Sequence, residues 1–349
     1  MSYNNSINCL KASTVALFLL FLQPLHAQKD FLDLTRLLDE KKAALGNDFI
    51  LLIGNADTTV YQKEWGSMKA KTVAPLAAAS GWLTAALVLQ LADEGKLSLD
   101  DKITKYLPVY EKYGKNYITI RHCLSHLTGI QDSKGKLTRL MERKKFATLD
   151  EQVADFAAKE IETNPGTAFS YSNMGLNIAG RILEIVSRKR FDLLAKQKLF
   201  NPLGMRQTTF TTLDGSAPDP SGGARSTAAD YMAFLKMLLN GGKHNGQQIL
   251  SEAAMTELRA IQSTNLTMNA VPKAATGYAY ALGAWAPEKE GNQATVLTSP
   301  SLSGTWPAVN YCRGYTFLFL TKEVLNDGKH EVYEEMKKLI DPQFSSACK

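Results

Sequence analysis

The sequence predicts a protein of the α/β (α+β) class, with strands near both chain ends and helices between them. Near the N-terminus, residues 49–54 and 58–66 are two strand-like runs separated by a turn-forming Asn-Ala-Asp segment. Near the C-terminus, three more strand-like runs occupy residues 276–285, 294–299 and 315–320. Between these groups, apolar residues recur mainly at helical spacing.

Helices are predicted at both ends of the chain and throughout its middle. Residues 30–45 place several leucines on or near one face, and residues 329–340 form a closing helix. The stretch 75–91 carries no charge, and its apolar residues surround the helix, which predicts a buried helix that stops near Gly95. Further helices are expected at residues 118–130, 149–158 and 175–188.

Length and composition favour a globular protein. The chain has 349 residues, of which 45% are hydrophobic and 21% charged, so it can form one large domain or two ordinary ones. The formal net charge is +6, but the lysines and arginines are scattered along helix-like stretches. Because nucleic-acid sites need a basic stripe with interleaved aromatic residues, we expect no nucleic-acid partner.

The first 27 residues are typical of a secretory signal peptide. Lys11 precedes an apolar core at residues 15–22, and Ala27 supplies a small residue before the expected cleavage point. This core is too short to span a bilayer, which needs about 20 apolar residues, and no later segment is long enough either. We therefore expect a periplasmic or secreted protein without a membrane span.

Three cysteines remain after removal of residues 1–27, and an odd number leaves at least one free thiol. Cys312 and Cys348 could form a bridge that ties down the C-terminal tail. Cys123 lies in an apolar helical run, which favours a small core residue over a reactive thiol.

Several segments resemble the serine β-lactamase-like hydrolases, which include class C β-lactamases, related DD-peptidases and family VIII carboxylesterases. The matching segments are PLAAASGWLTAALVLQLADEGKLSLDD (75–101), ITIRHCLSHLTGI (118–130), LFNPLGMRQTTF (199–210) and the stretch 221–251. The resemblance implies one domain, 28–349, with a β-lactamase/transpeptidase-like fold. Its antiparallel sheet, about 28–75 and 270–349, would be flanked by helices, with a helical part inserted at about 76–269.

In this family the buried helix opens with Ser-x-x-Lys, and the match across residues 82–86 places the nucleophile on Ala78 and the lysine on Gly81. An acyl-transfer serine needs a base, and a residue three positions along a helix lies on the same face. Both reactive groups are therefore missing. Ser80 lies about 200° round a helix from position 78, so we expect it to be a structural residue.

Two further motifs are matched in part. Tyr171 and Asn173 match the family's Tyr-x-Asn, in which the tyrosine moves protons and the asparagine holds the substrate. The family's Lys-Thr-Gly or His-x-Gly falls on 301–303, so that Ser301 replaces the basic residue and Ser303 the glycine. Pro300 makes a regular strand less favourable here. We expect Tyr171, Asn173, Ser301 and Ser303 to contact a ligand.

His122 and His126 are four residues apart, which is also a metal-ligand spacing. No glutamate of a metalloprotease pattern lies between them, and no third ligand is evident in the sequence. A structural role near the helix end is the favoured interpretation, and we expect no metal or other cofactor.

Three functional hypotheses follow. The first is a cell-envelope relative of the serine hydrolases that has lost catalysis and binds a peptidoglycan-like or ester ligand, or a partner. The second is an active esterase, DD-peptidase or β-lactamase-like enzyme that uses another nucleophile and a new base near Tyr171. The third is an interaction protein whose pocket is collapsed and filled.

Overall fold

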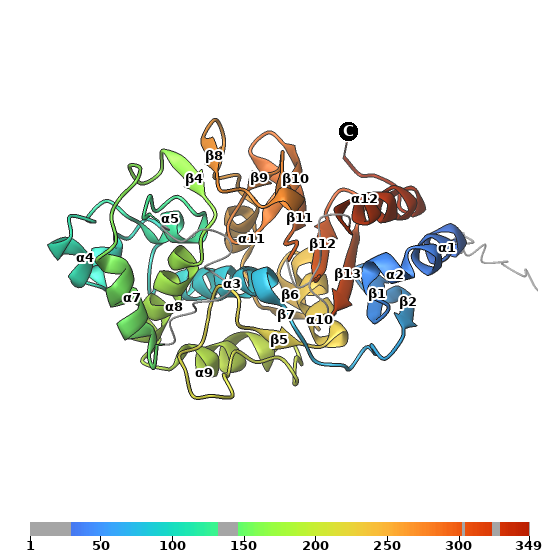
Figure 1. The fold of residues 1–349 in the computed structure, drawn as a ribbon, viewed down its shortest axis with the longest axis horizontal. Coiled ribbons are helices and arrows are strands. Elements are labelled where there is room, and N and C mark those ends of the chain that lie inside the picture. The colour runs from blue at the N-terminus through green and yellow to red at the C-terminus, as the bar shows by residue number, and fades with distance from the viewer. Residues whose placement is uncertain (1–28, 132–145, 302–303, 323–328, 349) are drawn as a thin grey trace, which may run out of the picture.

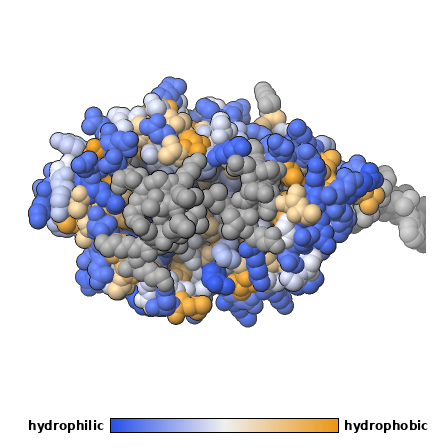
Figure 2. Space-filling view, viewed as in Figure 1, coloured by the Kyte–Doolittle hydropathy of each residue, from blue (hydrophilic) through white to orange (hydrophobic). Residues whose placement is uncertain are grey.

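The computed structural model describes residues 29–131, 146–301, 304–322 and 329–348 (Figure 1). The predicted signal peptide, residues 1–27, and Ser303 lie outside this described part. Within it, no helix is long and apolar enough to cross a membrane. The described surface in Figure 2 is mostly hydrophilic, with apolar residues in small scattered groups.

A seven-stranded antiparallel sheet has the order β2-β1-β13-β12-β11-β10-β9. Strands β1 and β13 pair with each other, so a strand from near the start of the chain lies beside one from near its end. This confirms the predicted antiparallel sheet with flanking helices. The strands are β1 Phe49–Gly54, β2 Thr59–Trp65, β9 Ala279–Tyr280, β10 Trp285–Glu290, β11 Gln293–Thr298, β12 Trp306–Asn310 and β13 Tyr315–Thr321.

Eleven α-helices lie in the described part of the chain. They are α1 Leu32–Glu40, α2 Lys42–Leu45, α3 Ser80–Asp93, α4 Val109–Lys112, α5 Ile120–Leu124, α7 Leu149–Ala157, α8 Met174–Ser187, α9 Phe191–Ala195, α10 Ala228–Leu239, α11 Glu252–Arg259 and α12 Lys329–Ile340. Short 3-10 or π turns are η1 Ala77–Ala79, η2 Ile103–Lys105, η3 Lys196–Phe200, η4 Lys273–Ala275 and η5 Asp341–Gln343.

Three small strand pairs lie outside the main sheet. They are β3 Ala74–Pro75 with β5 Arg225–Ser226, β4 Ala168–Ser170 with β8 Thr267–Asn269, and β6 Lys243–His244 with β7 Gln247–Gln248. The first of these pairs fixes the chain just ahead of α3.

The sheet separates two apolar layers because successive side chains of a strand point to opposite faces. In β1, Leu51 and Ile53 pack into a layer with α1 and α12, whereas Ile50 and Leu52 pack into the larger core that contains α3 and α10. Figure 1 shows α1, α2 and α12 together on one side of the sheet, with α3, α8 and α10 beyond its opposite side.

Helix α3 lies at the centre of the larger core. Every residue from Ser80 to Leu91 is buried, which confirms the predicted buried helix. Two of its polar side chains donate to backbone carbonyls: the Thr84 hydroxyl to Pro220 at 2.6 Å, and the Gln90 amide to Ile249 at 3.0 Å. These bonds hold the helix against segments that are far away in the sequence.

The predicted start of this helix at residue 75 was wrong. Residues 74–75 form a strand, residues 77–79 form a 3-10 turn, and the α-helix begins at Ser80. Ala77 has a φ of 45°, in the left-handed region, so a regular helix cannot pass through it. The Leu76 N–H instead donates to the Ala224 carbonyl at 2.9 Å.

Other boundaries also differ from the sequence prediction. Residues 30–45 form two helices that meet at Lys41, and the helix predicted at 118–130 is helical only over 120–124. Strand β12 was not predicted: Pro307 lies inside it, and proline is unusual in a central strand. The strand predicted at 276–285 was wrong: only Ala279–Tyr280 (β9) is a strand before a turn, and β10 begins at Trp285 and continues through charged, exposed residues.

The cysteine prediction was correct. Cys312 and Cys348 form a disulfide, and Cys123 is a free, buried cysteine. Burial raises the pKa of the Cys123 thiol well above its ordinary value, so this thiol stays protonated and unreactive at physiological pH.

Candidate active site

The site is built at the point where α3 begins. Ala78, at the predicted nucleophile position, is half-buried in the η1 turn. The Tyr231 hydroxyl donates to the carbonyl of the neighbouring Ala79 at 2.9 Å, which fixes this turn from α10. Ser80 is fully buried, and its hydroxyl oxygen accepts the Ala224 N–H at 3.0 Å. Ser80 therefore serves the fold, as its place in the sequence predicted.

Gly81, at the predicted lysine position, is enclosed on two sides. A Cβ atom built on Gly81 would lie 2.7 Å from Leu176 Cδ1, on α8. On another side, the turn before β10 lies so close that a Cβ on Gly283 would be 2.9 Å from the Gly81 carbonyl oxygen. The space into which a side chain at position 81 would extend is thus filled by Leu176, which is itself buried.

Tyr171 and Asn173 lie in the short connection between β4 and α8. The Tyr171 side chain is half-buried, and its ring is 4.4 Å from the His126 ring and 5.6 Å from the Trp285 ring, centroid to centroid. Asn173 is exposed at the N-terminal end of α8, where its side chain makes no capping hydrogen bond. The tyrosine is thus held by aromatic packing, whereas the asparagine amide faces solvent.

Burial raises the pKa of the Tyr171 phenol to about 12, and the negative charge of Asp219 adds to this effect. The phenol therefore stays protonated near pH 7. A neutral phenol can donate a hydrogen bond to a ligand, but it cannot take a proton from a nucleophile.

Ser301 lies between β11 and β12, where the chain forms a turn and no strand, as Pro300 predicted. It is only 5% exposed. Its N–H donates to the Thr305 carbonyl at 3.0 Å, and its own carbonyl accepts the Gly304 N–H at 3.0 Å. Both N–H groups are thus bonded within the turn. Ser303 lies outside the described residues.

The three motif segments come together around the start of α3. Leu176, three residues after Asn173, packs on Gly81, and the Thr305 hydroxyl donates to the Pro75 carbonyl at 3.2 Å. The second and third motifs are therefore both connected directly to the segment that carries Ala78.

The two histidines have separate structural roles. His122 Nδ1 accepts the Thr119 N–H at 3.2 Å, and Thr119 in turn caps the start of α5. His126 lies beyond the end of α5 with a φ of 57°, so the two side chains do not share a helix face. No group of three or more His, Cys, Asp or Glu side chains suitable for a metal occurs in the described part of the chain.

His126 is a buried, neutral residue behind Tyr171. Its Nδ1 accepts the Ser172 N–H at 3.3 Å, so its proton lies on Nε2, which donates to the Tyr280 hydroxyl at 2.9 Å. Burial lowers the pKa of this ring to about 3. Both ring nitrogens are therefore occupied by the packing of the β4–α8 connection.

The sequence did not reveal Leu176, Gly283 or the aromatic cluster around Tyr171 as parts of the site. One signal was available for Leu176, because it lies three residues after Asn173, the N-cap residue of α8, and residues three apart lie near one helix face. The aromatic contacts of Phe169, Tyr280 and Trp285 depend on tertiary packing between β4, β9 and β10.

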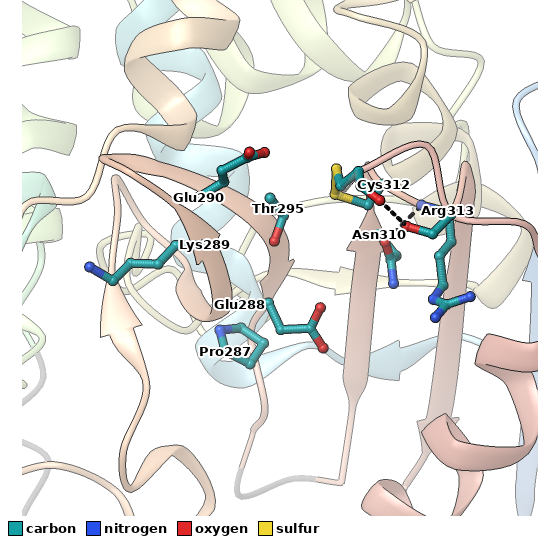
Figure 3. A pocket seen from close by; sticks show the side chains of 10 residues that line it. Pro287, Glu288, Lys289, Glu290, Thr295, Asn310, Cys312 and Arg313 are labelled. Atoms are coloured by element: carbon teal, nitrogen blue, oxygen red, sulfur yellow. Dashed lines mark hydrogen bonds between the residues drawn. A yellow bond between two sulfur atoms is a disulfide. The ribbon is translucent and has the colours of Figure 1, made fainter.

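A cavity of about 550 Å³ formed by described residues lies away from these positions, at one end of the sheet (Figure 3). The Cys312–Cys348 disulfide lines it, together with charged residues that include Lys289, Glu290 and Arg313. Figure 3 shows these side chains on the hairpin of β10 and β11 and on the turn after β12. None of the motif residues contributes to this cavity.

This architecture and sequence are similar to those of known proteins. The beta-lactamase family model matches residues 47–335. Penicillin-binding protein 4 of Amycolatopsis lactamdurans is 28% identical over 237 residues, 58% of this chain and 60% of its own length. Penicillin-binding protein 4* of Bacillus subtilis is 30% identical over 173 residues, 48% of this chain and 36% of its own length.

Among solved structures, the crystal structure of a "putative beta-lactamase" from Bacteroides dorei superposes with a TM-score of 0.80 and 26% identity. The match covers 90% of this chain and 99% of that one. The family match, the antiparallel sheet with its helical partner layers and the segments quoted above agree with one another. This chain belongs to the beta-lactamase family.

Proposed function

We propose that this chain is a catalytically inactive member of the beta-lactamase family that binds a peptidoglycan-like or ester ligand, or a partner, at the site around Ala78. One observation carries the proposal: Gly81 stands where the family's lysine is expected, and Leu176 occupies the adjoining space. Without a base next to position 78, even a hydroxyl group there would remain a weak nucleophile.

The state of Tyr171 supports the loss of acyl transfer. Its phenol is neutral at physiological pH because burial raises its pKa to about 12. His126, whose ring contacts Tyr171, uses both of its nitrogens in hydrogen bonds and is also neutral. Neither group can act as the new base that a different nucleophile would need, and this argues against the active-hydrolase alternative.

The turn at 301–305 supports the same conclusion. An oxyanion site requires backbone N–H groups that point at the developing charge. Here the Ser301 and Gly304 N–H groups donate to carbonyls of their own turn. These two N–H groups are therefore not available to an oxyanion in this arrangement.

Ligand binding is supported by the polar groups that remain. The Asn173 amide is exposed and makes no capping bond, and the neighbouring Tyr171 hydroxyl belongs to a half-buried ring fixed by aromatic contacts. A fixed donor beside a free amide is suited to hold a peptide or ester carbonyl. Ser301, Ser303 and Ala78 would line the same site.

We also propose that the protein works in the cell envelope or outside the cell. The apolar segment at residues 15–22 supports export. The Cys312–Cys348 disulfide gives independent support, because disulfides persist mainly in oxidising compartments.

Ligand binding can be tested by thermal shift with a D-alanyl-D-alanine-terminated muropeptide and a short-chain ester. We expect stabilisation of the unmodified protein that Asn173→Ala abolishes, because the exposed amide is then lost. Gln247→Ala, an exposed amide on the distant β6–β7 hairpin, is the matched control. Absence of any shift with either compound would favour the collapsed-pocket hypothesis instead.

A further inference from the structure

A second cavity, of about 580 Å³, opens between the α4–α5 connection and the α7–β4 connection. Figure 1 places α4 and α7 at the end of the molecule opposite α1 and α12. We call this cavity the tyrosine groove. The residues that matter for its chemistry are Tyr113, Lys115, Tyr117, Lys159, Glu160 and Ile161. None of the motif residues lines it.

The groove concentrates exposed apolar surface. Tyr113 is 42% exposed, Tyr117 71% and Ile161 38%, and these are three of the six large hydrophobic side chains that are exposed in the described part of the chain. Single exposed apolar residues need no explanation, but a cluster that lines one cavity indicates a binding surface. Tyrosine rings offer a flat apolar face with a polar tip.

The groove also contains a buried cation. Lys115 is only 3% exposed, and its Nζ donates to the carbonyls of Ala157 at 2.8 Å and Lys159 at 2.6 Å. No carboxylate pairs with it in the described part of the chain. The same Nζ lies 5.5 Å from the centroid of the Tyr113 ring, which also lines the groove.

A buried ammonium group that no described carboxylate neutralises is unfavourable, and an anionic ligand would relieve this cost. Lys159 and Glu160 add one positive and one negative charge, so that with Lys115 the groove has a net charge of +1, and Asn164 adds an amide that can hydrogen-bond hydroxyls. The ligand that fits must therefore combine flat apolar faces, hydroxyl groups and a negative charge.

We propose that the tyrosine groove binds a carbohydrate chain that carries carboxylate groups. Tyr113 and Tyr117 stack against the C–H faces of sugar rings, and Lys115 Nζ donates to a sugar carboxylate. This assignment goes beyond the function proposed for the site around Ala78. It shares no residue with that site, so either can fail while the other holds.

The test is isothermal titration calorimetry of the mature chain with hexamers of alginate and of polygalacturonate. Neutral chitohexaose serves as the comparison ligand. We expect at least one acidic hexamer to bind, and Tyr117→Ala to raise its Kd about tenfold or more. Tyr117 is largely exposed, so this variant should keep the fold. Leu193→Ala, another exposed apolar residue outside the groove, should leave Kd within about twofold.

Lys115→Met tests the charge. We expect it to abolish the preference for acidic over neutral hexamers, and added salt should weaken acidic binding to the unmodified protein. Equal binding of chitohexaose would overturn the carboxylate assignment. Failure of both acidic hexamers to bind, or an unchanged Kd in Tyr117→Ala, would overturn the site. Unchanged thermal shifts with the muropeptide in Tyr117→Ala would show that the two sites are separate.

Discussion

Leu176 packs against Gly81 so closely that even a methyl group at position 81 would force it to move, since the distance to Cδ1 would be 2.7 Å. Glycine inside a helix costs about 1 kcal/mol relative to alanine. In this chain the glycine permits the leucine to enter the centre of the site. A buried apolar side chain there replaces the charge that the family's lysine would bring.

A double-mutant cycle measures this contact. We expect Gly81→Ala to stabilise the protein by about 1 kcal/mol in a Leu176→Ala background, where the overlap is gone. In the unmodified protein the gain should be offset by the displaced leucine, which gives a coupling of at least ~0.5 kcal/mol. Urea unfolding of the four proteins provides the values. Additive effects would mean that the two residues do not touch.

His126 should make stability depend on pH. Its folded pKa of about 3 lies below its ordinary value of 6.5, so between these values the unfolded chain binds one proton more. The stability that the neutral ring contributes is fully present above about pH 6.5. It is lost as pH falls toward 3, at up to about 1.4 kcal/mol per pH unit.

The measurement compares urea unfolding of the unmodified protein and His126→Asn between pH 7 and pH 4. Asparagine tolerates the left-handed backbone at this position, where φ is 57°. We expect the variant to be less stable at pH 7 but to lose less stability on acidification, because the other titrating groups are common to both. Parallel curves would show that His126 titrates normally in the folded protein.

At the scale of the elements, the backbone of the turn that precedes α3 is strained. Ala77 has a φ of 45°, which costs a non-glycine residue roughly 1 kcal/mol, and it directly precedes Ala78. The strain persists because the β3–β5 pair and the Tyr231 bond to Ala79 hold both ends of the turn. Strained backbone of this kind is frequent at functional sites.

Ala77→Gly should therefore stabilise the protein, by up to about 1 kcal/mol, even though glycine adds freedom to the unfolded chain. Ala79→Gly is the control, because Ala79 has a φ of −64° and gains nothing from glycine. We expect the control to lose about 1 kcal/mol. Thermal melts of both variants measure the difference, and a destabilised Ala77→Gly would contradict the strain.

The C-terminal segment depends on the disulfide. Cys312 and Cys348 are 36 residues apart, and closing a loop of this length stabilises a fold by about 3–4 kcal/mol in the chain-entropy treatment. We expect the Cys312→Ser/Cys348→Ser variant to lose about 2–4 kcal/mol. Adding dithiothreitol to the unmodified protein should have the same effect. If the variant is as stable as the parent, the disulfide has no structural role.

At the scale of the whole molecule, the pairing of β1 with β13 joins the two chain ends through one sheet. The sequence predicted β1, β13 and α3 well, because each is an uninterrupted apolar run, and the family resemblance implied how they are arranged. It predicted β12 and the beginning of α3 poorly. Pro307 lies inside β12, and proline is unusual in a central strand, so the sequence does not indicate one there. The three alanines 77–79 favour a helix, although hydrogen bonds to distant segments hold them in a turn.

For the candidate site, the sequence yielded predictions only in the segments that resemble the family motifs. The resemblance to the family motifs assigned Tyr171 and Asn173, and it placed the nucleophile and lysine positions on Ala78 and Gly81. The leucine beside Gly81 and the bonded turn amides at 301 and 304 arise from segments that meet only in the folded state. These contacts bear most directly on activity, and no local sequence pattern predicts them.

The most direct test of catalytic inactivity is intact mass spectrometry of residues 28–349 after incubation with a penicillin, alongside nitrocefin hydrolysis. It compares the unmodified chain with Ala78→Ser/Gly81→Lys, and with Ala78→Ser/Gly81→Met as the control that lacks the amine. The lysine stem must displace Leu176, whose Cδ1 is the flexible end of a side chain.

We predict no adduct and no turnover in the unmodified protein or in the methionine control. We predict a covalent penicilloyl adduct in the lysine variant, because the base would then stand one helical turn from the new serine. An adduct on the unmodified chain would contradict the account and, after peptide mapping, would identify the nucleophile that the chain actually uses.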